Sequence, residues 1–223
     1  MAKVKIITAY IPIPNHPRTA EEYGKLGEGF RGITAAPVKA FYQQLADLWL
    51  GQFVWSQPNK ITHSEGDNPA KNTLAYHIVQ HNKFAWLTAA AITDPDPDVF
   101  VWLDYGIFHQ PNVTAKVIDD FVRRVDDKYI YAPGCWPEKP VDDSSPCWRF
   151  CGSMFAVPRR FLQPLDNRFR EETKRNIWKT KNLSWEVNDL ARMEQSYREL
   201  PIHWYKGDHD QTQFTNYGAP HAT

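Results

Sequence analysis

The chain has 223 residues, in which 26 Lys and Arg balance 26 Asp and Glu, so the formal net charge is zero. A chain of this length can bury a substantial core, and we expect one α/β domain over residues 1–223. The even charge predicts no overall field that would attract nucleic acid or an anionic membrane, although a local basic patch is compatible with it.

The N-terminal residues and the cysteines indicate in which cellular compartment the protein is expected. The first residues enter a strand pattern at once, too short and polar for a secretion signal, and no apolar run approaches the length of a membrane span. Three cysteines, Cys135, Cys147 and Cys151, cannot all pair with one another. They also lack the paired spacing of a structural zinc site, and no histidine follows at the usual interval. We therefore expect reduced thiols in a cytoplasmic protein.

The chain begins with a strand pattern and then a helix signal. Residues 3–11 alternate and are rich in β-branched side chains, which predicts a first strand. Thr19 and Glu22 have the spacing of a capping box at a helix start. Glycines punctuate residues 24–32, so we expect this segment to be irregular.

The next segments lead to a central strand. Apolar residues recur at helical spacing over residues 37–48, which predicts a helix with Pro37 in its first turn. A short second strand is expected at 52–55, and one or two helices over 73–94. A continuous apolar run then predicts a strand at 99–103 that is buried on both faces.

Strands alternate with helices along the rest of the chain. This alternation predicts a mainly parallel central sheet flanked by helices on both faces, in which the later strands can pair antiparallel. The remaining predicted elements are a helix over 114–125, strands over 128–132, 149–157 and 200–205, and helical segments over 158–162, 168–177 and 184–197.

Asp104 follows the central strand directly, and Gly106 and His109 come soon after it. In open α/β sheets, ligands bind in the crevice beyond the carboxyl ends of the strands. An acid at this position can therefore meet a metal ion or a phosphate-bearing ligand. The alternative is that Asp104 only caps the following turn.

A second polar cluster lies near the C-terminus, where Asp208, His209, Asp210 and Gln211 are consecutive. Carboxylate oxygens and imidazole nitrogens suit Mn²⁺ or Mg²⁺ when the phosphates of a ligand complete the coordination shell. The alternative is a solvated loop with no ligand.

Two further groups of residues can have either a functional or a purely structural role. Ser184 has the character of an N-cap, so Glu186 and Asp189 are either first-turn acids favoured by the helix dipole or a catalytic base. Gly152, in the predicted strand 149–157, indicates either close approach by a ligand or another backbone, or a bulge.

Several common motifs are missing from the sequence. It has no dinucleotide-binding glycine fingerprint, no P-loop and no nucleophile elbow, which argues against a Rossmann dehydrogenase, an ATPase and an α/β-hydrolase. Lys71 and Lys83 precede the central strand and could reach a pyrophosphate, whereas most exposed helical lysines have no specific partner. Nine tryptophans predict an aromatic core, with one or two free to face a sugar or a base.

The run Val-Phe-Val-Trp-Leu-Asp-Tyr-Gly-Ile at residues 99–107 resembles the HtrL/YibB-type bacterial proteins and, more loosely, glycosyltransferases of the A fold. The segments at 150–155, 185–188 and 203–210 are consistent with the same group. This resemblance implies a glycosyltransferase of A-like fold that takes a sugar from a nucleotide-sugar donor. It also implies a divalent cation, Mn²⁺ or Mg²⁺, that bridges the diphosphate of the donor. The usual motif there has two acids, and this chain has Asp104 alone.

The resemblance also suggests roles for particular residues. It implies that Asp104, Asp208 and His209 hold the metal, and that Glu186 or Asp189 takes the proton of the acceptor hydroxyl. Donor-binding residues are then expected at Thr8, Tyr10, Lys71, Lys83, Asp104 and Gly106, and acceptor-binding residues at Gly152, Ser153 and Trp185.

Two alternative functions stay open at the level of sequence. A nucleotidyltransferase could use a similar sheet and metal, and a non-catalytic nucleotide- or carbohydrate-binding protein could keep the aromatic crevice without turnover. The expected acceptor is a hydroxyl of a glycan. A modified base in DNA is conceivable, but the neutral net charge does not support it. No membrane span and no protein partner are implied.

Overall fold

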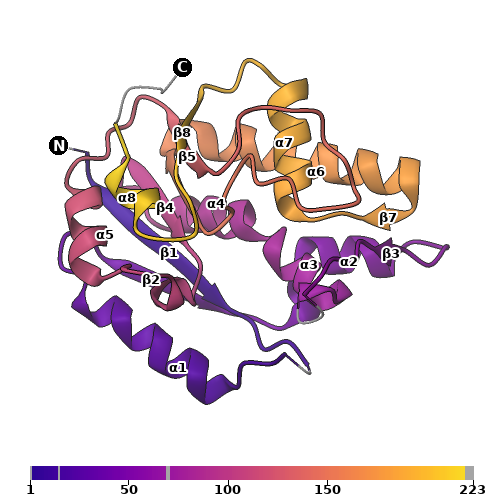
Figure 1. The fold of residues 1–223 in the computed structure, drawn as a ribbon, viewed down its shortest axis with the longest axis horizontal. Coiled ribbons are helices and arrows are strands. Elements are labelled where there is room, and N and C mark those ends of the chain that lie inside the picture. Colours follow the sequence, from indigo (N-terminus) through magenta and orange to yellow (C-terminus); the bar gives the residue numbers. More distant parts are fainter. Residues whose placement is uncertain (1, 15, 69–70, 219–223) are drawn as a thin grey trace.

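A computed structural model describes residues 2–14, 16–68 and 71–218 of the chain, and its centre is a six-stranded sheet (Figure 1). The strands lie in the order β2-β1-β4-β6-β5-β8. Strand β6 is antiparallel to both of its neighbours, β4 and β5, and the other strand pairs are parallel. The mainly parallel sheet predicted from the sequence is therefore confirmed. The strands are β1 (Val4–Tyr10), β2 (Val38–Tyr42), β4 (Val99–Leu103), β5 (Ile130–Gly134), β6 (Met154–Pro158) and β8 (Ile202–Lys206).

Helices cover both faces of this sheet. A small parallel pair, β3 (Thr62–His63) with β7 (Asn182–Leu183), lies outside it. None of the helices in the described ranges has the length and apolarity needed to cross a bilayer. The α-helices are α1 (Ala20–Glu28), α2 (Trp49–Trp55), α3 (Leu74–Gln80), α4 (Lys83–Thr93), α5 (Ala115–Val122), α6 (Arg159–Thr180), α7 (Glu186–Ser196) and α8 (Thr212–Thr215). Short 3-10 helices include η1 (Gly29–Gly32), η2 (Leu45–Asp47) and η4 (Ile107–His109).

Strand β4 supplies side chains to two hydrophobic clusters, one on each face of the sheet. Phe100 and Trp102 point into a larger cluster with α2, α3, α4, α6 and α7. Val99, Val101 and Leu103 point to the opposite face, where α5 and α8 pack. All five residues are buried, as expected for a central strand whose side chains alternate between two covered faces.

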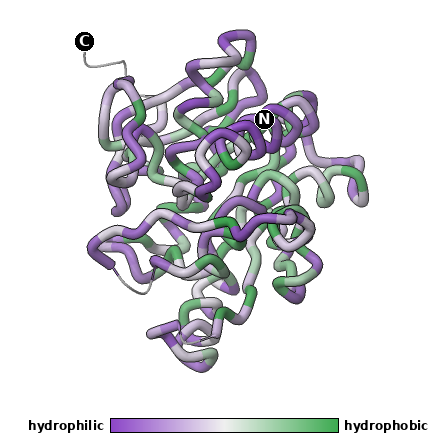
Figure 2. The backbone as a smooth tube through the Cα atoms, turned by 90° about the vertical axis from the view of Figure 1, so that its right-hand side faces the viewer, coloured by the Kyte–Doolittle hydropathy of each residue, from purple (hydrophilic) through white to green (hydrophobic). Residues whose placement is uncertain are grey.

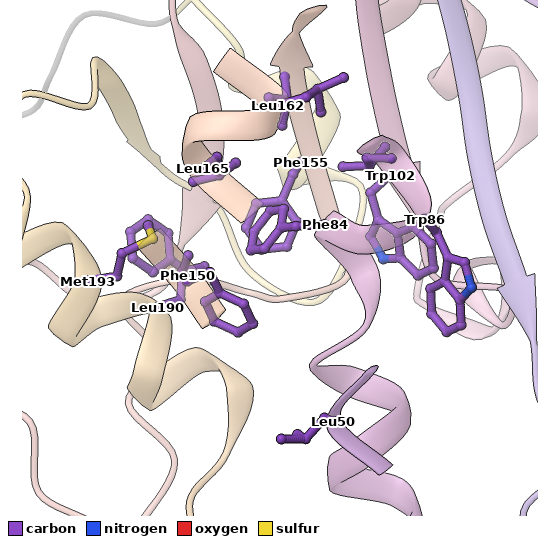
Figure 3. Packing of buried hydrophobic residues seen from close by; sticks show 14 of the residues in the cluster. Leu50, Phe84, Trp86, Trp102, Phe150, Phe155, Leu162, Leu165, Leu190 and Met193 are labelled. Atoms are coloured by element: carbon purple, nitrogen blue, oxygen red, sulfur yellow. The ribbon is translucent and has the colours of Figure 1, made fainter. Parts of the chain in front are cut away.

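The larger cluster is dominated by aromatic rings. The indoles of Trp86 and Trp102 stack with their centroids 5.5 Å apart and their planes at 8°, and Phe84 contacts Phe155 from the next strand (Figure 3). Figure 2 shows hydrophobic residues gathered along the segments in the middle of the molecule, with further ones at its lower and right-hand edges. Trp86, Trp102 and Trp185 are buried, and Trp49 and Trp204 pack partly buried against this cluster. Trp55 and Trp178 are exposed, so the predicted core role holds for only part of the tryptophans.

The first helix corrects the expectation that residues 24–32 are irregular. Thr19 and Glu22 form the predicted capping box, and α1 then runs through Gly24 and Gly27 to Glu28. A Cβ on Gly27 would lie 2.3 Å from the hydroxyl of Tyr105. Here glycine permits close packing of the helix rather than ending it.

The segment 37–55 is also different from the prediction. Residues 38–42 form strand β2, which pairs with β1 in the register Ile6↔Val38, and residues 49–55 form helix α2. The apolar spacing over 37–48 is helical, so periodicity alone gave the wrong structure there, and a short apolar run such as 52–55 is ambiguous by periodicity. Pairing with β1 stabilises residues 38–42 as a strand.

The strand predicted at 149–157 is shorter than expected. Gly152 has a φ of +75°, a left-handed backbone conformation that cannot continue a strand, so β6 begins only at Met154. The two helical segments predicted after it are one helix, α6, which continues through Pro164. Its buried face, including Leu162, Leu165 and Phe169, packs on the core and offsets the hydrogen bond lost at the proline.

Candidate functional site

A cavity of about 1080 Å³ opens at the carboxyl edge of the sheet. Tyr10 at the end of β1 and Asp104 just after β4 line it. Because β6 is antiparallel to its neighbours, its start meets the same edge, and Ser153 joins the lining there. Ligand pockets usually measure about 300–1,000 Å³, so this cavity has room for a large ligand.

The wall of the cavity contains a buried charge cluster centred on Lys83. The Lys83 Nζ atom lies 2.8 Å from the carbonyl oxygen of Gly152, 3.0 Å from Glu186 Oε1 and 3.4 Å from Asp104 Oδ1. The Lys83 side chain is only 3% exposed. An ammonium has three protons, and these three acceptors use all of them. We call Lys83, Asp104, Glu186 and the Gly152 carbonyl the Lys83 cluster.

The charges of this cluster stabilise one another. Burial by itself would lower the pKa of Lys83, but the carboxylates of Asp104 and Glu186 outweigh it and hold that pKa above its ordinary value. Burial would likewise raise the pKa of Glu186, but the Lys83 ammonium outweighs it and holds that pKa below its ordinary value. Both side chains are therefore charged at neutral pH. Glu186 is also the first residue of α7, where the helix dipole favours a carboxylate.

Neighbouring groups hold the cluster in place. The indole Nε1 of Trp102 donates a hydrogen bond to Asp104 Oδ1 at 2.8 Å, and Trp102 itself is fixed by stacking on Trp86. A Cβ on Gly152 would lie 2.7 Å from Glu186 Oε1, so a side chain at this position would displace the carboxylate. The group that approaches Gly152 is therefore the side chain of Glu186, and not the ligand or second backbone considered from the sequence.

Three tyrosines form an aromatic wall on one side of the cavity. The ring of Tyr10 lies 5.3 Å from that of Tyr23 and 5.2 Å from that of Tyr105, measured between centroids. Arg18 lies over Tyr23, with Cζ 5.9 Å from the ring centroid. Burial, together with a hydrogen bond to Tyr42, raises the pKa of Tyr105 to about 12, so its hydroxyl is neutral at physiological pH.

Many of the residues predicted from the sequence meet at this cavity. Gly106 contributes to its lining, and Arg18 and Lys71 bring positive charge to it. Trp185 also lines the cavity but is only 5% exposed, and the hydroxyl of Ser153 donates to Gln213 Oε1 at 2.6 Å. The predicted residues in the lining are Tyr10, Lys71, Lys83, Asp104, Gly106, Ser153, Trp185, Glu186 and His209.

Asp189 does not belong to the cavity lining. Its side chain is fully buried, with Oδ1 2.9 Å from Arg192 and Oδ2 3.2 Å from His81 Nε2. It also accepts from Asn176 on α6, so it joins α7 to α6. Trp185, not Ser184, is the N-cap of α7. Of the two candidate bases, only Glu186 reaches the cavity.

Thr8, Gly152 and Asp208 also lie outside the lining. Thr8 is buried within the sheet, and its hydroxyl has no hydrogen-bond partner among the described residues. Gly152 reaches the site only through its carbonyl. Asp208 is an exposed residue beside the cavity.

The predicted site for Mn²⁺ or Mg²⁺ stays a prediction. Oδ1 of Asp104 accepts from an indole and faces the Lys83 ammonium, which leaves its other oxygen, Oδ2, for a further ligand. Asp208 and His209 instead approach the thiol of Cys135, with Asp208 Oδ1 3.4 Å from Sγ. Hard cations such as Mg²⁺ prefer oxygen ligands to thiols.

The sequence did not predict several of the residues that line the cavity. Arg18 lies in the loop after β1, and the rule that loops at the carboxyl ends of strands carry ligand sites could have found it. Tyr105 is next to Asp104 in the chain, whereas no sequence signal identifies Tyr23 and Tyr76, which reach the site only through the packing of α1 and α3.

No family model matches the sequence, and neither does any curated protein. The chain is similar to the crystal structure of a glycosyltransferase involved in the glycosylation of the major capsid of PBCV-1, with 14% identity, a TM-score of 0.46, and coverage of 92% of this chain and 82% of that one. It is also similar to the apo form of mouse xyloside xylosyltransferase 1, with 9% identity, a TM-score of 0.46, and coverage of 91% and 85%. The resemblance to HtrL/YibB-type proteins stays a prediction.

Proposed function

We propose that this chain is a glycosyltransferase that binds a nucleotide-sugar donor in the cavity at the carboxyl edge of the sheet. The observation that carries the proposal is the Lys83 cluster, in which the carboxyl groups of Asp104 and Glu186 line a large cavity that has an aromatic wall. Planar rings bind the faces of bases and sugars, and carboxylates accept hydrogen bonds from sugar hydroxyls.

Different groups in the cavity bind the base and the diphosphate of the donor. The wall of Tyr10, Tyr23 and Tyr105 offers a surface for the base. Arg18 and Lys71 supply positive charge for the diphosphate. The ammonium of the Lys83 cluster has no proton left for a ligand, so Lys83 acts as a positioning residue that holds Asp104 in place and lowers the pKa of Glu186.

The carboxylates face the reacting sugars. Oδ2 of Asp104 and Oε2 of Glu186 take no hydrogen bond from the described residues, which leaves them free to accept from hydroxyl groups. In the reaction, an acceptor hydroxyl attacks the anomeric carbon, the bond from that carbon to the diphosphate oxygen breaks, and a base takes the hydroxyl proton. Glu186 is ionised and on the cavity wall, which suits it to this role. Arg18 and Lys71 stabilise the charge that develops on the leaving diphosphate.

The first test is binding. A panel of nucleoside diphosphates and nucleotide sugars, each with and without Mn²⁺, is screened by thermal shift. A ligand at a hundredfold excess over its dissociation constant adds about 2.7 kcal/mol of stability, which raises the melting temperature measurably. If no compound in the panel raises it, the donor site at Asp104 is wrong.

The second test is turnover with the donor that binds. Glycosyl transfer or slow donor hydrolysis releases nucleoside diphosphate, whereas a nucleotidyltransferase releases pyrophosphate. Binding without release of either product identifies a non-catalytic binding protein. We expect Asp104→Asn, which removes a charged hydrogen-bond acceptor from the site, to lower turnover by about 10²-fold or more while leaving the fold intact. The matched control is Asp120→Asn, which changes an exposed acid on α5 and is expected to retain full activity.

A further inference from the structure

The geometry points to a binding site for a thiophilic divalent metal, of which Zn²⁺ is the type, formed by Cys135, Cys151 and His209. Each residue lies in a loop at the carboxyl edge of the sheet. Cys135 directly follows β5, Cys151 lies three residues before β6, and His209 lies three residues after β8. Strands β6, β5 and β8 are neighbours in that order, so the fold brings three distant segments to one point. This site adjoins the same cavity as the Lys83 cluster but uses none of its side chains, and it does not depend on the proposed function.

Two of the distances between the candidate ligand atoms are close to the edges of a tetrahedral site. With Zn–S bonds of about 2.3 Å and Zn–N bonds of about 2.0–2.1 Å, a tetrahedron has S···S edges of about 3.8 Å and S···N edges of about 3.6 Å. The Sγ atoms of Cys135 and Cys151 are 3.9 Å apart, and Cys135 Sγ is 4.0 Å from His209 Nδ1. The three ligand atoms all lie within 4.8 Å of one another.

The imidazole of His209 is oriented as a ligand. Its Nε2 lies 3.1 Å from the carbonyl oxygen of Cys151. A carbonyl only accepts hydrogen bonds, so Nε2 carries a proton, and in the neutral ring the lone pair is on Nδ1, the atom that faces Cys135. Metal-binding histidines commonly donate their second N–H to a carbonyl in this way. The ring is also held edge-on by Trp148, with centroids 4.7 Å apart.

A fourth group is close to the first three. Asp208 Oδ1 lies 3.4 Å from Cys135 Sγ and 3.3 Å from His209 Nδ1. Cys151 and His209 also line the cavity, so water from the cavity has access to the same point. Two thiolates with an imidazole form a donor set that selects Zn²⁺ over Mn²⁺ or Mg²⁺.

Metal binding here is a proton-releasing step. In the metal-free protein the thiol of Cys135 donates to Asp208 Oδ1, and that of Cys151 donates to the carbonyl of Gly207. When the metal binds, two metal–sulfur bonds form and the two thiol protons pass to solvent. No oxidant or reductant is needed.

The test uses the full chain, reduced and stripped of metal with a chelator. Titration with Co²⁺ is followed by its thiolate charge-transfer and d–d absorption, and Zn²⁺ is titrated in competition with a chromophoric chelator. We expect one Zn²⁺ per chain, with thiolate bands for bound Co²⁺. Cys135→Ser and His209→Ala are each expected to weaken binding by at least about a hundredfold, because each removes one ligand. Cys147→Ser, which changes the buried cysteine outside the cluster, is expected to bind as the wild type does.

Two results would overturn the site. One is a folded, reduced wild-type chain that takes up no Zn²⁺ in competition with the chelator. This result overturns the site even if Cys135 and Cys151 form a disulfide when the chain is later exposed to air. The other is Zn²⁺ binding that Cys135→Ser and His209→Ala leave unchanged. Circular dichroism of each variant checks its fold, and the wild-type titration decides the matter if a variant does not fold.

Discussion

Replacement of Lys83 by methionine tests the electrostatics of the Lys83 cluster. The change keeps most of the side-chain volume and removes the ammonium that lies 3.0 Å from Glu186 Oε1 and 3.4 Å from Asp104 Oδ1. Breaking a buried ion pair from one side costs about 3–5 kcal/mol, because it leaves an uncompensated charge. The Asp104 side chain is 31% exposed and regains water, so we expect the lower end, a loss of about 3 kcal/mol at neutral pH.

The loss of stability is expected to depend on pH. In the wild type the pKa of Glu186 lies below its unfolded value, so its ionisation stabilises the fold above the unfolded pKa, and this contribution is lost as the pH falls through the folded pKa. Without Lys83, burial dominates and raises the pKa of Glu186 above its unfolded value. The ionised carboxylate then destabilises the variant at neutral pH and is relieved by protonation in acid. The difference between the two proteins therefore shrinks towards about pH 4.

Urea unfolding monitored by tryptophan fluorescence measures this difference at both pH values. Lys25→Met is the matched control, because Lys25 and its partner Glu21 are 70% and 78% exposed, and it is expected to change stability little. Glu186→Gln combined with Lys83→Met should be less destabilised than the sum of the two single changes. A loss that is equal at both pH values, or strictly additive changes, would refute the reasoning.

The remaining predictions concern packing and capping. Gly134→Ala should lower the free energy of unfolding by about 4 kcal/mol or more, or prevent folding, because the new Cβ would lie 1.7 Å from the backbone oxygen of Arg149. Gly24→Ala should have the opposite effect, because nothing lies within 4 Å of its Cβ and alanine stabilises a helix by up to about 1 kcal/mol relative to glycine. Thermal unfolding measures both changes. Asp119→Ala should cost about 2–4 kcal/mol at neutral pH, because its carboxylate accepts from the backbone N–H of Thr34 at 2.9 Å and from its hydroxyl at 2.7 Å. Burial by itself would raise the pKa of Asp119, but these hydrogen bonds outweigh it and hold the pKa below its ordinary value. The loss of stability in the variant should therefore become smaller as the pH falls through that pKa. Urea unfolding measures this loss, and a loss independent of pH would contradict the prediction.

The predicted elements that proved correct are those whose signal is local. Strand β4 is a continuous apolar run, and α5 begins after Thr114, whose hydroxyl accepts from Val117 N. The capping box of Thr19 and Glu22 likewise needs only four consecutive residues. Such signals depend on neighbours in the chain, and the sequence contains those in full.

The predictions that failed depended on distant contacts. The apolar spacing over 37–48 is helical, yet residues 38–42 pair with β1 as a strand. The glycines of α1 resemble helix breakers until Tyr105 is placed against Gly27. Composition and spacing describe a segment, whereas the partner across the sheet or in the next layer is known only after the chain has folded.

The candidate site divides in the same way. The sequence by itself determined that an acid follows the central strand and that Glu186 lies in the first turn of a helix, because strand and helix ends are local features. Only the tertiary structure decided that Lys83 meets both acids, since its ammonium needs acceptors from separate segments to be buried. It also brought Cys135, Cys151 and His209 together although their spacing in the chain has no zinc signature. Neighbouring strands of a sheet are not neighbours in sequence, so a site at their shared edge is assembled by topology alone.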